Sequence, residues 1–170
     1  KNLQEFRDFT ESYAYMDCPR PYMRLCTQHI VVMDYIEGTP VSHLGLLKYE
    51  GYDPDEIGTK LVDNYATQVL DKGFFHADPH SGNIIIRGGQ IVLIDLGMVG
   101  RINGEMRSIL RQMIFAVPRK DSVTLEDGLL RLAEVSPGAL RIDRAALLSD
   151  IDLLIADFGT VDLNDLDIAK

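Results

Sequence analysis

The sequence predicts a mixed α+β fold that is mainly helical and contains one small antiparallel β-hairpin. Gly88-Gly89 separates two runs of Ile, Val and Leu, which is typical of a hairpin. Most of the remaining chain places apolar residues at helical spacing between residues that start or stop helices. With 46% apolar and 25% charged residues, the 170-residue chain has the composition of a folded globular protein.

Composition excludes several classes of partner. The formal net charge is −9 and no cluster of Lys or Arg stands out, which argues against a nucleic-acid or anionic-lipid surface. Cys18 and Cys26 have no metal-binding spacing and are predicted to be reduced thiols. No apolar run reaches the roughly 18 residues that a membrane-spanning helix needs, so we expect no transmembrane segment in this chain.

The first forty residues are predicted to form the end of a helix and two strands. One helical face carries the apolar residues Leu3, Phe6 and Phe9. Residues 22–26 and 29–36 have the pattern of two strands joined by a short turn, and 30–33 reads as a buried strand. Gly38 and Pro40 then begin a linker.

Two helices are predicted before the hairpin. A short one covers Ser42–Tyr49. A longer one starts at Asp53 as N-cap, with Pro54 at the first helical position, Glu56 completing a capping box, and Gly73 as a left-handed C-terminal cap. Its apolar stripe consists of Ile57, Leu61, Tyr65 and Val69.

Three further helices are predicted after the hairpin. Their N-caps are Asn103, Asp121 and Asp143, and they are expected to end at Val117, near Val135 and near Phe158. Pro137-Gly138 separates the last two. We expect the acidic residues of the third helix, Asp150, Asp152 and Asp157, to face solvent, and residues 162–167 to form a solvated end.

The stretch Gly73-Phe-Phe-His-Ala-Asp-Pro-His-Ser-Gly-Asn83 precedes the hairpin, and Asp95-Leu-Gly97 follows it. His76, Asp78 and Asn83 have the spacing H-x-D-x-x-x-x-N. This order, with a later aspartate, is similar to that of protein kinases, which place a catalytic aspartate, a metal-binding asparagine and a metal-binding aspartate in this way.

The register of the hairpin decides which side chains share a face. A two-residue loop at Gly88-Gly89 pairs Asn83 with Ile94 and puts Asp95 on the other face, because side chains alternate along a strand. A three-residue loop that includes Gln90 pairs Asn83 with Asp95. We expect the second register, or a bulge with the same effect. Regular pairing out to Asn83 with the shorter loop would count against a shared metal.

These residue types suit magnesium chemistry. Asn83 and Asp95 offer one amide and one carboxylate oxygen, and magnesium fills the rest of its shell with water and phosphate oxygens. Asp78 is free to accept the proton of an attacking hydroxyl. His76 is predicted to support the loop, whereas His80 could either contact a phosphate oxygen or support the loop.

A rival interpretation takes the motif as a metal cluster. His76, Asp78 and His80 form H-x-D-x-H, whose alternating side chains can converge on zinc or iron in an extended segment. It leaves Asn83 and Asp95 without a role, so we rank it lower.

The motif F-H-A-D-P-H-x-G-N over residues 74–83, with residues 93–100, resembles the UbiB/aarF-domain (ADCK-type) atypical kinase family, although Ser81 stands where that family usually has proline. The resemblance implies the C-terminal lobe of a protein-kinase-like fold, with a small catalytic β-hairpin and a remnant of N-lobe strands at the hinge. It places the end of the N-lobe and the hinge in residues 1–40 and the C-lobe in 41–170. The family's N-lobe motifs, including K-x-G-Q, do not occur in this sequence.

The resemblance also implies site residues and cofactors. Met33 would be the gatekeeper, and the backbone of Asp34 and Ile36 would bind the adenine of ATP. Gly82 and Gly97 would support the loop. With magnesium on Asn83 and Asp95, the expected activity is phosphoryl transfer or ATP hydrolysis linked to ubiquinone biosynthesis, and weak or absent in these 170 residues alone.

The implied partners are a nucleotide, a lipid or quinone precursor, and the missing N-lobe. The implied location of the protein is the cytoplasmic side, with membrane association through parts outside this chain. Two alternative functions are a small-molecule phosphotransferase of aminoglycoside- or choline-kinase type and a non-enzymatic nucleotide-binding scaffold. Ala77 and Pro79-His80 favour the UbiB type over the former. The full set of Asp78, Asn83 and Asp95 argues against the latter.

Overall fold

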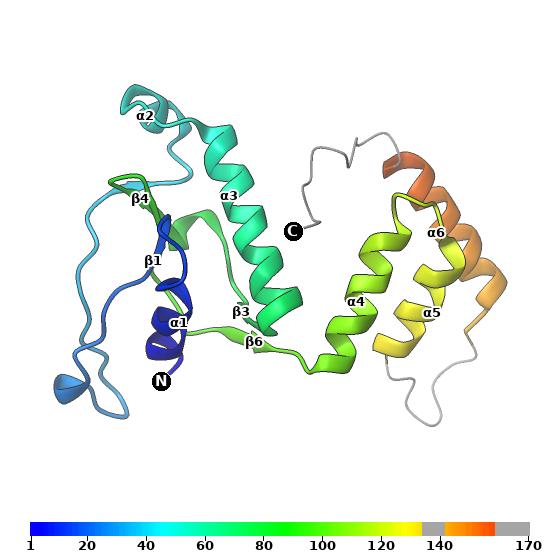
Figure 1. Cartoon of the computed structure of the whole chain (residues 1–170), viewed down its shortest axis with the longest axis horizontal. Helices are drawn as coiled ribbons and strands as arrows, with labels where there is room; N and C mark the ends of the chain where they lie inside the picture. The colour runs from blue at the N-terminus through cyan, green and yellow to red at the C-terminus, as the bar shows by residue number, and fades with distance from the viewer. Residues whose placement is uncertain (134–141, 159–170) are drawn as a thin grey trace. The chain divides into compact units, whose positions relative to one another are not determined.

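The computed structural model describes residues 1–133 and 142–158, which belong to two compact units (Figure 1). The first unit consists of residues 1–68 and 74–101, and the second draws on 69–73 and 102–170. Helices supply more residues than the short strands, which agrees with the predicted mixed α+β class. This division does not follow the predicted lobe boundary after residue 40, which stays a prediction about a larger fold.

The first unit contains a four-stranded sheet in the order β1-β5-β4-β2. Its strands are β1 (Met16–Asp17), β5 (Gln90–Leu93), β4 (Ile84–Arg87) and β2 (Thr39–Pro40). The β1–β5 pair is parallel, and the other two pairs are antiparallel.

The hairpin is present, but its predicted register is wrong. Arg87 pairs with Gln90 and Ile84 with Leu93, so the loop has two residues rather than three. Gly88 and Gly89 have φ of 56° and 81°. Two consecutive left-handed residues form the turn whose twist matches a tight hairpin, so this glycine pair selects the shorter loop.

A second, two-stranded sheet joins β3 (Phe74–His76) to β6 (Val99–Arg101). Strand β6 was not predicted from the sequence. The pairing places the start of the motif loop beside the segment that follows Asp95, with His76 opposite Val99.

Helix α1 (Asn2–Thr10) confirms the first predicted helix and packs on the core of this unit. Phe6 is fully buried, and its ring lies 5.6 Å from that of Phe9 and 6.0 Å from that of Phe74. Leu3 packs against the same cluster. The predicted apolar face is therefore the face that is buried.

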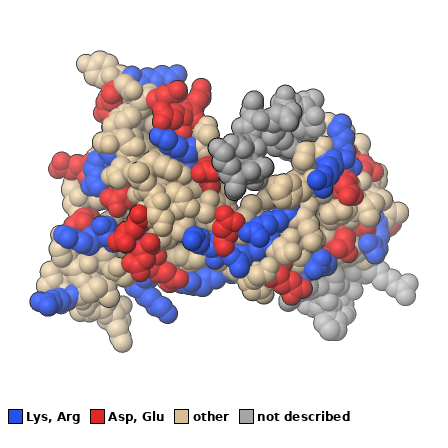
Figure 2. Space-filling view, in the orientation of Figure 1, with Lys and Arg blue, Asp and Glu red and all other residues tan. Residues whose placement is uncertain are grey.

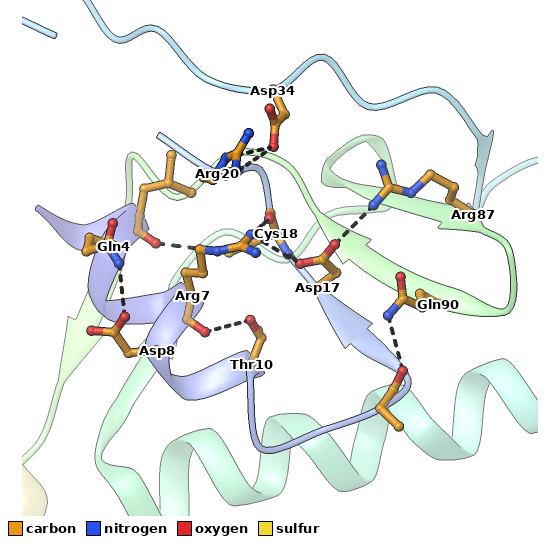
Figure 3. A network of polar contacts seen from close by, with 12 residues as sticks. Gln4, Arg7, Asp8, Thr10, Asp17, Cys18, Arg20, Asp34, Arg87 and Gln90 are labelled. Carbon is orange, nitrogen blue, oxygen red and sulfur yellow. Dashed lines mark hydrogen bonds and ion pairs between the residues drawn. The ribbon is translucent and has the colours of Figure 1, made fainter. Parts of the chain in front are cut away.

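Polar contacts connect α1 and β1 to the hairpin (Figure 3). The Asp17 carboxylate lies 3.5 Å from the Arg7 guanidinium and 3.0 Å from that of Arg87, and Arg7 also donates to the Cys18 carbonyl. Gln90 donates to the carbonyl of Ala14. These bonds hold the two-residue strand β1 against β5, where the ladder alone is short.

Both cysteines are free thiols, as predicted. Cys18 is buried, and this burial raises the pKa of its thiol to about 11, so the thiol is protonated at neutral pH.

The two strands predicted between residues 22 and 36 are wrong. Met23–Leu25 forms a 3-10 turn, and a single isolated bridge joins Pro21 to Met33. The run predicted as a buried strand is exposed, with Ile30 at 58% and Val31 at 67%. No described helix or strand covers this run, so β-propensity alone does not bury it.

Helix α2 (Leu44–Tyr49) and helix α3 (Pro54–Ala66) are present, and α3 continues as a π-helix over Thr67–Lys72. The Asp53 carboxylate caps α3 by accepting from the Asp55 amide at 2.9 Å. The predicted capping box is wrong, because Glu56 pairs with Lys60 instead. Gly73 has a φ of 66°, as its predicted role as a left-handed cap requires.

The predicted apolar stripe of this helix is only partly correct. Ile57 is buried, while Leu61, Tyr65 and Val69 are half-buried. The other fully buried side chains of the segment are the amides of Asn64 and Gln68.

In its described residues, the second unit contains three helices side by side, α4 (Gly104–Ala116), α5 (Ser122–Leu132) and α6 (Arg144–Phe158) (Figure 1). The predicted caps Asn103, Asp121 and Asp143 each accept backbone N–H bonds of the helix that follows. Their core consists of Ala116, Leu125, Ile151 and Ile155.

Some predictions for this unit lie outside the described residues: the end of the second helix near Val135, Pro137-Gly138, and the acidic stretch 162–167. The Asp157 side chain is also outside them. Asp150 and Asp152 are exposed, as predicted. No helix within the described part is long and apolar enough to span a bilayer. On the face shown in Figure 2, basic side chains are interspersed with acidic ones.

Candidate functional site

The motif loop is ordered by its own hydrogen bonds. The Asn83 N–H donates to the His80 carbonyl at 2.9 Å, which closes a 3-10 turn over Ser81–Asn83. The Asn83 side chain is 7% exposed, and its Nδ2 donates to the Asp78 carbonyl at 3.1 Å. Since this bond uses the amide nitrogen, Oδ1 of Asn83 remains free to bind a cation.

This 3-10 turn also interrupts the hairpin at Asn83. Ile94 donates its N–H to the Asn83 carbonyl at 3.0 Å, but the Asn83 N–H turns to His80 instead of returning the bond. The ladder is therefore half-formed at this pair. The strict alternation of side chains applies only as far as Ile84 and Leu93, so the two-residue loop does not by itself decide on which side Asn83 and Asp95 lie.

Asp95 begins a tight turn after β5. Its Oδ1 accepts the Gly97 N–H at 2.8 Å, which leaves Oδ2 without a partner among the hydrogen bonds of the described residues. A Cβ on residue 97 would lie 3.0 Å from Oδ1. Glycine thus lets the carboxylate fold back onto the turn, in keeping with the supporting role predicted for Gly97.

A cavity of about 810 Å³ lies within the first unit. Six of the predicted site residues line it, namely Met33, Asp34, Ile36, Asn83, Asp95 and Gly97. Two segments that are far apart in the sequence, the predicted hinge and the flanks of the hairpin, therefore bound one space.

Asp78 and His80 do not belong to the lining of this cavity. Both side chains are about half exposed, and His80 Nε2 lies 3.7 Å from Asp78 Oδ2. His80 Nδ1 accepts the Gly82 N–H at 3.0 Å, so the proton of the neutral ring is on Nε2, which faces Asp78. A Cβ on Gly82 would lie 2.9 Å from the His80 ring, which explains the glycine.

His76, for which we predicted a role in supporting the loop, is fully buried. Its Nδ1 accepts the Asp78 N–H at 3.1 Å, and its Nε2 is buried without a partner. Burial lowers the pKa of His76, and the nearby Asp78 and Asp95 oppose this shift only in part. The neutral ring is the form that can accept from Asp78.

This burial predicts a pH effect on stability. In the unfolded chain His76 takes up a proton near pH 6.5, whereas the folded state resists it, so His76 lowers the unfolding free energy as pH falls below about 6.5. Chemical denaturation at pH 7.5 and pH 5.5 should show a smaller acid-induced loss in His76→Gln than in the parent. The exposed His29→Gln is the control and should lose as much as the parent. Equal losses in all three proteins would contradict the prediction.

The rival metal cluster is not formed. Over residues 1–133 and 142–158, no group of three or more His, Cys, Asp or Glu side chains is placed to hold a metal. In the H-x-D-x-H segment, Nδ1 of His76 and Nδ1 of His80 already accept backbone N–H bonds.

Several residues of this region were not identified from the sequence. Leu3 of α1 and Cys26 line the cavity, and the buried amides Asn64 and Gln68 lie behind the loop. The sequence carries one signal for this amide pair, which is the i, i+4 spacing of two carboxamide side chains within a predicted helix. Nothing in the local pattern indicates that Cys26 lies near the hairpin.

Comparison with known proteins shows the family. The model of the ABC1 atypical kinase-like domain matches residues 1–128. An uncharacterized protein in the hydrogenase 1 5' region of Clostridium pasteurianum is 33% identical over 168 residues, covering 99% of this chain and 31% of that protein. "Protein ACTIVITY OF BC1 COMPLEX KINASE 8, chloroplastic" of Arabidopsis thaliana is 30% identical over 139 residues, 80% of this chain and 18% of that protein.

A "Probable protein kinase UbiB" of Pseudomonas putida is 32% identical over 125 residues, 71% of this chain and 23% of that protein. The chain therefore belongs to the ABC1 atypical kinase-like family, and its predicted resemblance to UbiB-type proteins is confirmed. It spans less than a third of the length of each of these three relatives.

Proposed function

We propose that the chain forms the metal-binding and catalytic part of an ATP- and magnesium-dependent kinase or ATPase of UbiB type. One observation carries the proposal. A single cavity of about 810 Å³ has the predicted hinge, Met33 to Ile36, on its wall together with Asn83 and Asp95. A nucleotide in this space would meet the base-binding segment and the metal-binding pair within one unit.

The hinge offers free backbone groups for a purine. The Asp34 N–H donates to the Arg20 carbonyl at 3.1 Å. The Asp34 carboxylate lies 3.9 Å from the Arg20 guanidinium (Figure 3) and accepts from the Tyr22 hydroxyl. No hydrogen bond of the described residues uses the Asp34 carbonyl or the Ile36 N–H. These two groups are one acceptor and one donor, which suits the edge of adenine.

The metal-binding pair fits magnesium by its chemistry. Asn83 Oδ1 and Asp95 Oδ2 are hard oxygen ligands that make no hydrogen bond to the described residues, and few protein ligands are typical of magnesium bound with phosphates. When bound, magnesium neutralises charge on the phosphates during transfer. Asp78 would orient or deprotonate the acceptor hydroxyl or water, and the proton on His80 Nε2 would steady the Asp78 carboxylate.

The names of relatives support the reaction class. One relative is named "Probable protein kinase UbiB", and the name of another contains the words "BC1 COMPLEX KINASE". The proposal also includes the acceptor, which would be a quinone or lipid precursor, and a link to ubiquinone biosynthesis. It includes an N-lobe outside this chain and a membrane-associated location at the cytoplasmic side.

The test uses the full-length protein. We expect release of phosphate from ATP that requires magnesium and increases when phenolic quinone precursors are added. The 170 residues alone should bind nucleotide weakly and turn it over little. A full-length protein that neither binds nor hydrolyses ATP in the presence of magnesium would refute the proposal.

The two alternatives give different outcomes in the same assay. Phosphorylation of an aminoglycoside or choline would indicate a small-molecule phosphotransferase. The match to the ABC1 family argues against this alternative. Magnesium-dependent nucleotide binding without phosphate release or acceptor phosphorylation would indicate a scaffold.

A further inference from the structure

Three polar side chains are buried side by side behind the motif loop. Asn64, Gln68 and His76 are 0%, 1% and 0% exposed. Gln68 lies in the π-helix Thr67–Lys72, which extends α3. Helices of this type are rare and occur often at functional sites. The proposed reaction gives no role to Gln68.

A continuous path of hydrogen bonds runs from this helix to the candidate site. Gln68 Nε2 donates to Asn64 Oδ1 at 2.7 Å, and Gln68 Oε1 accepts the His76 N–H at 3.0 Å. His76 Nδ1 then accepts the Asp78 N–H, and the Asp78 carbonyl accepts from Asn83. The buried carboxamide of Gln68 is therefore connected to both Asp78 and Asn83.

His76 is held from both sides of its backbone. Tyr65 Oη donates to the His76 carbonyl at 2.8 Å, while Gln68 accepts the N–H. Within the part of the chain that the structure describes, β3 pairs only with β6. The carboxamide of Gln68 thus replaces a neighbouring strand at His76, and without it a buried N–H would lose its partner.

We propose that Gln68, together with Tyr65, is a positioning residue for the motif loop. By fixing the His76 backbone, the two residues set the His76 ring, and through it the direction of the Asp78 backbone and of the Asn83 amide. This inference rests on the proposed function, because it assigns Gln68 to the orientation of the magnesium ligand Asn83 and the catalytic Asp78.

A pair of substitutions separates hydrogen bonding from packing. Gln68→Met keeps the length of the side chain but removes both hydrogen bonds. Gln68→Glu keeps an acceptor for His76. Asn64 Nδ2 is buried without a partner among the described residues, so after a flip of the Asn64 amide this nitrogen can donate to the ionised carboxylate that Gln68→Glu introduces. If the introduced carboxyl group is protonated, it can donate to Asn64 Oδ1, as Gln68 does.

The experiment measures ATP turnover by the full-length protein as a function of magnesium concentration. Gln68→Met should raise the magnesium concentration for half-maximal turnover by about tenfold or more, as loss of groups that orient a metal ligand does. Gln68→Glu should stay close to the parent. Thr67→Ala is the matched control on the same helix, because Thr67 is half-buried and its hydroxyl, among the hydrogen bonds of the described residues, bonds only to the Asp63 carbonyl of its own helix. It should behave like the parent.

A positioning role and a packing role predict opposite rankings of Gln68→Met and Gln68→Glu. A packing role would tolerate Met and penalise a buried carboxylate, so a Gln68→Met protein with the magnesium requirement of the parent overturns the proposal. If Gln68→Met does not fold, Tyr65→Phe decides, since it removes only the bond to the His76 carbonyl. An unchanged magnesium requirement in Tyr65→Phe would then overturn the proposal.

Amide hydrogen exchange distinguishes this failure from failure of the proposed function, because it needs no turnover. Residues 74–83 should exchange faster in Gln68→Met and in Tyr65→Phe than in the parent, at unchanged exchange of α1. If the parent hydrolyses no ATP, the proposed function fails, and faster exchange of this segment would still support the positioning path. Unchanged exchange would refute it.

Discussion

Replacing Asp95 by Asn in the full-length protein should lower magnesium-dependent ATP turnover on the order of 10²- to 10³-fold, because a metal held against phosphates supplies several kcal/mol of charge stabilisation. Asparagine keeps an Oδ1 that can accept the Gly97 N–H, so the turn that Asp95 now closes is preserved. The loss is therefore one of charge at the metal rather than of local structure. Phosphate release at saturating and limiting magnesium measures it.

The matched control for this prediction is Asp150→Asn. Asp150 is exposed on α6 and has no predicted role in the site, so its neutralisation should leave turnover unchanged. An Asp95→Asn protein with the turnover and magnesium dependence of the parent would contradict a metal-binding role for Asp95. The cavity would then have to bind nucleotide without this carboxylate.

Replacing Phe6 by Ala should lower the unfolding free energy by about 3–5 kcal/mol, the usual cost of deleting a buried aromatic ring. Phe6 is fully buried between α1 and the sheets, in contact with Phe9 and Phe74. The space left by the Phe6 ring would lie in the core cluster against which Leu3 packs, and Leu3 also lines the proposed nucleotide site. Denaturation with urea, monitored by circular dichroism, measures the change.

Tyr49→Ala is the aromatic control for this effect. Tyr49 is 88% exposed at the end of α2, so its removal should change the unfolding free energy by less than about 0.5 kcal/mol. Similar losses for Phe6→Ala and Tyr49→Ala would show that α1 does not pack on the core as described.

Capping residues and the glycine turn were predictable because their physics is local. Asp53, Asn103, Asp121 and Asp143 cap the helices that were expected, since a carboxylate or amide satisfies N–H groups within three residues. The hairpin was also predicted, but its register was not. The predicted register required a regular strand from Asn83 onward, whereas Asn83 belongs to a 3-10 turn and β4 begins only at Ile84.

Predictions that depended on neighbours distant in sequence were the ones that failed. The run 30–33 has strong β-propensity but remains largely exposed, because burial depends on what covers a strand. The apolar stripe of α3 was similarly incomplete. Gln68 is buried where it accepts the His76 N–H, and Asn64 is buried where it accepts from Gln68. These hydrogen bonds exist only because β3 lies beside the helix.

The family, the spacing of the motif and the residue types suited to a magnesium nucleotide can be read from the order of the amino acids, since these are properties of side chains and local order. That Met33, Asp34 and Ile36 border the same cavity as Asn83 and Asp95, and that Asp78 lies outside its lining, emerges only from the folded chain. A cavity is formed by segments brought together through packing, and the contacts that pack them, such as Phe6 on Phe74, join residues with no relation in local sequence.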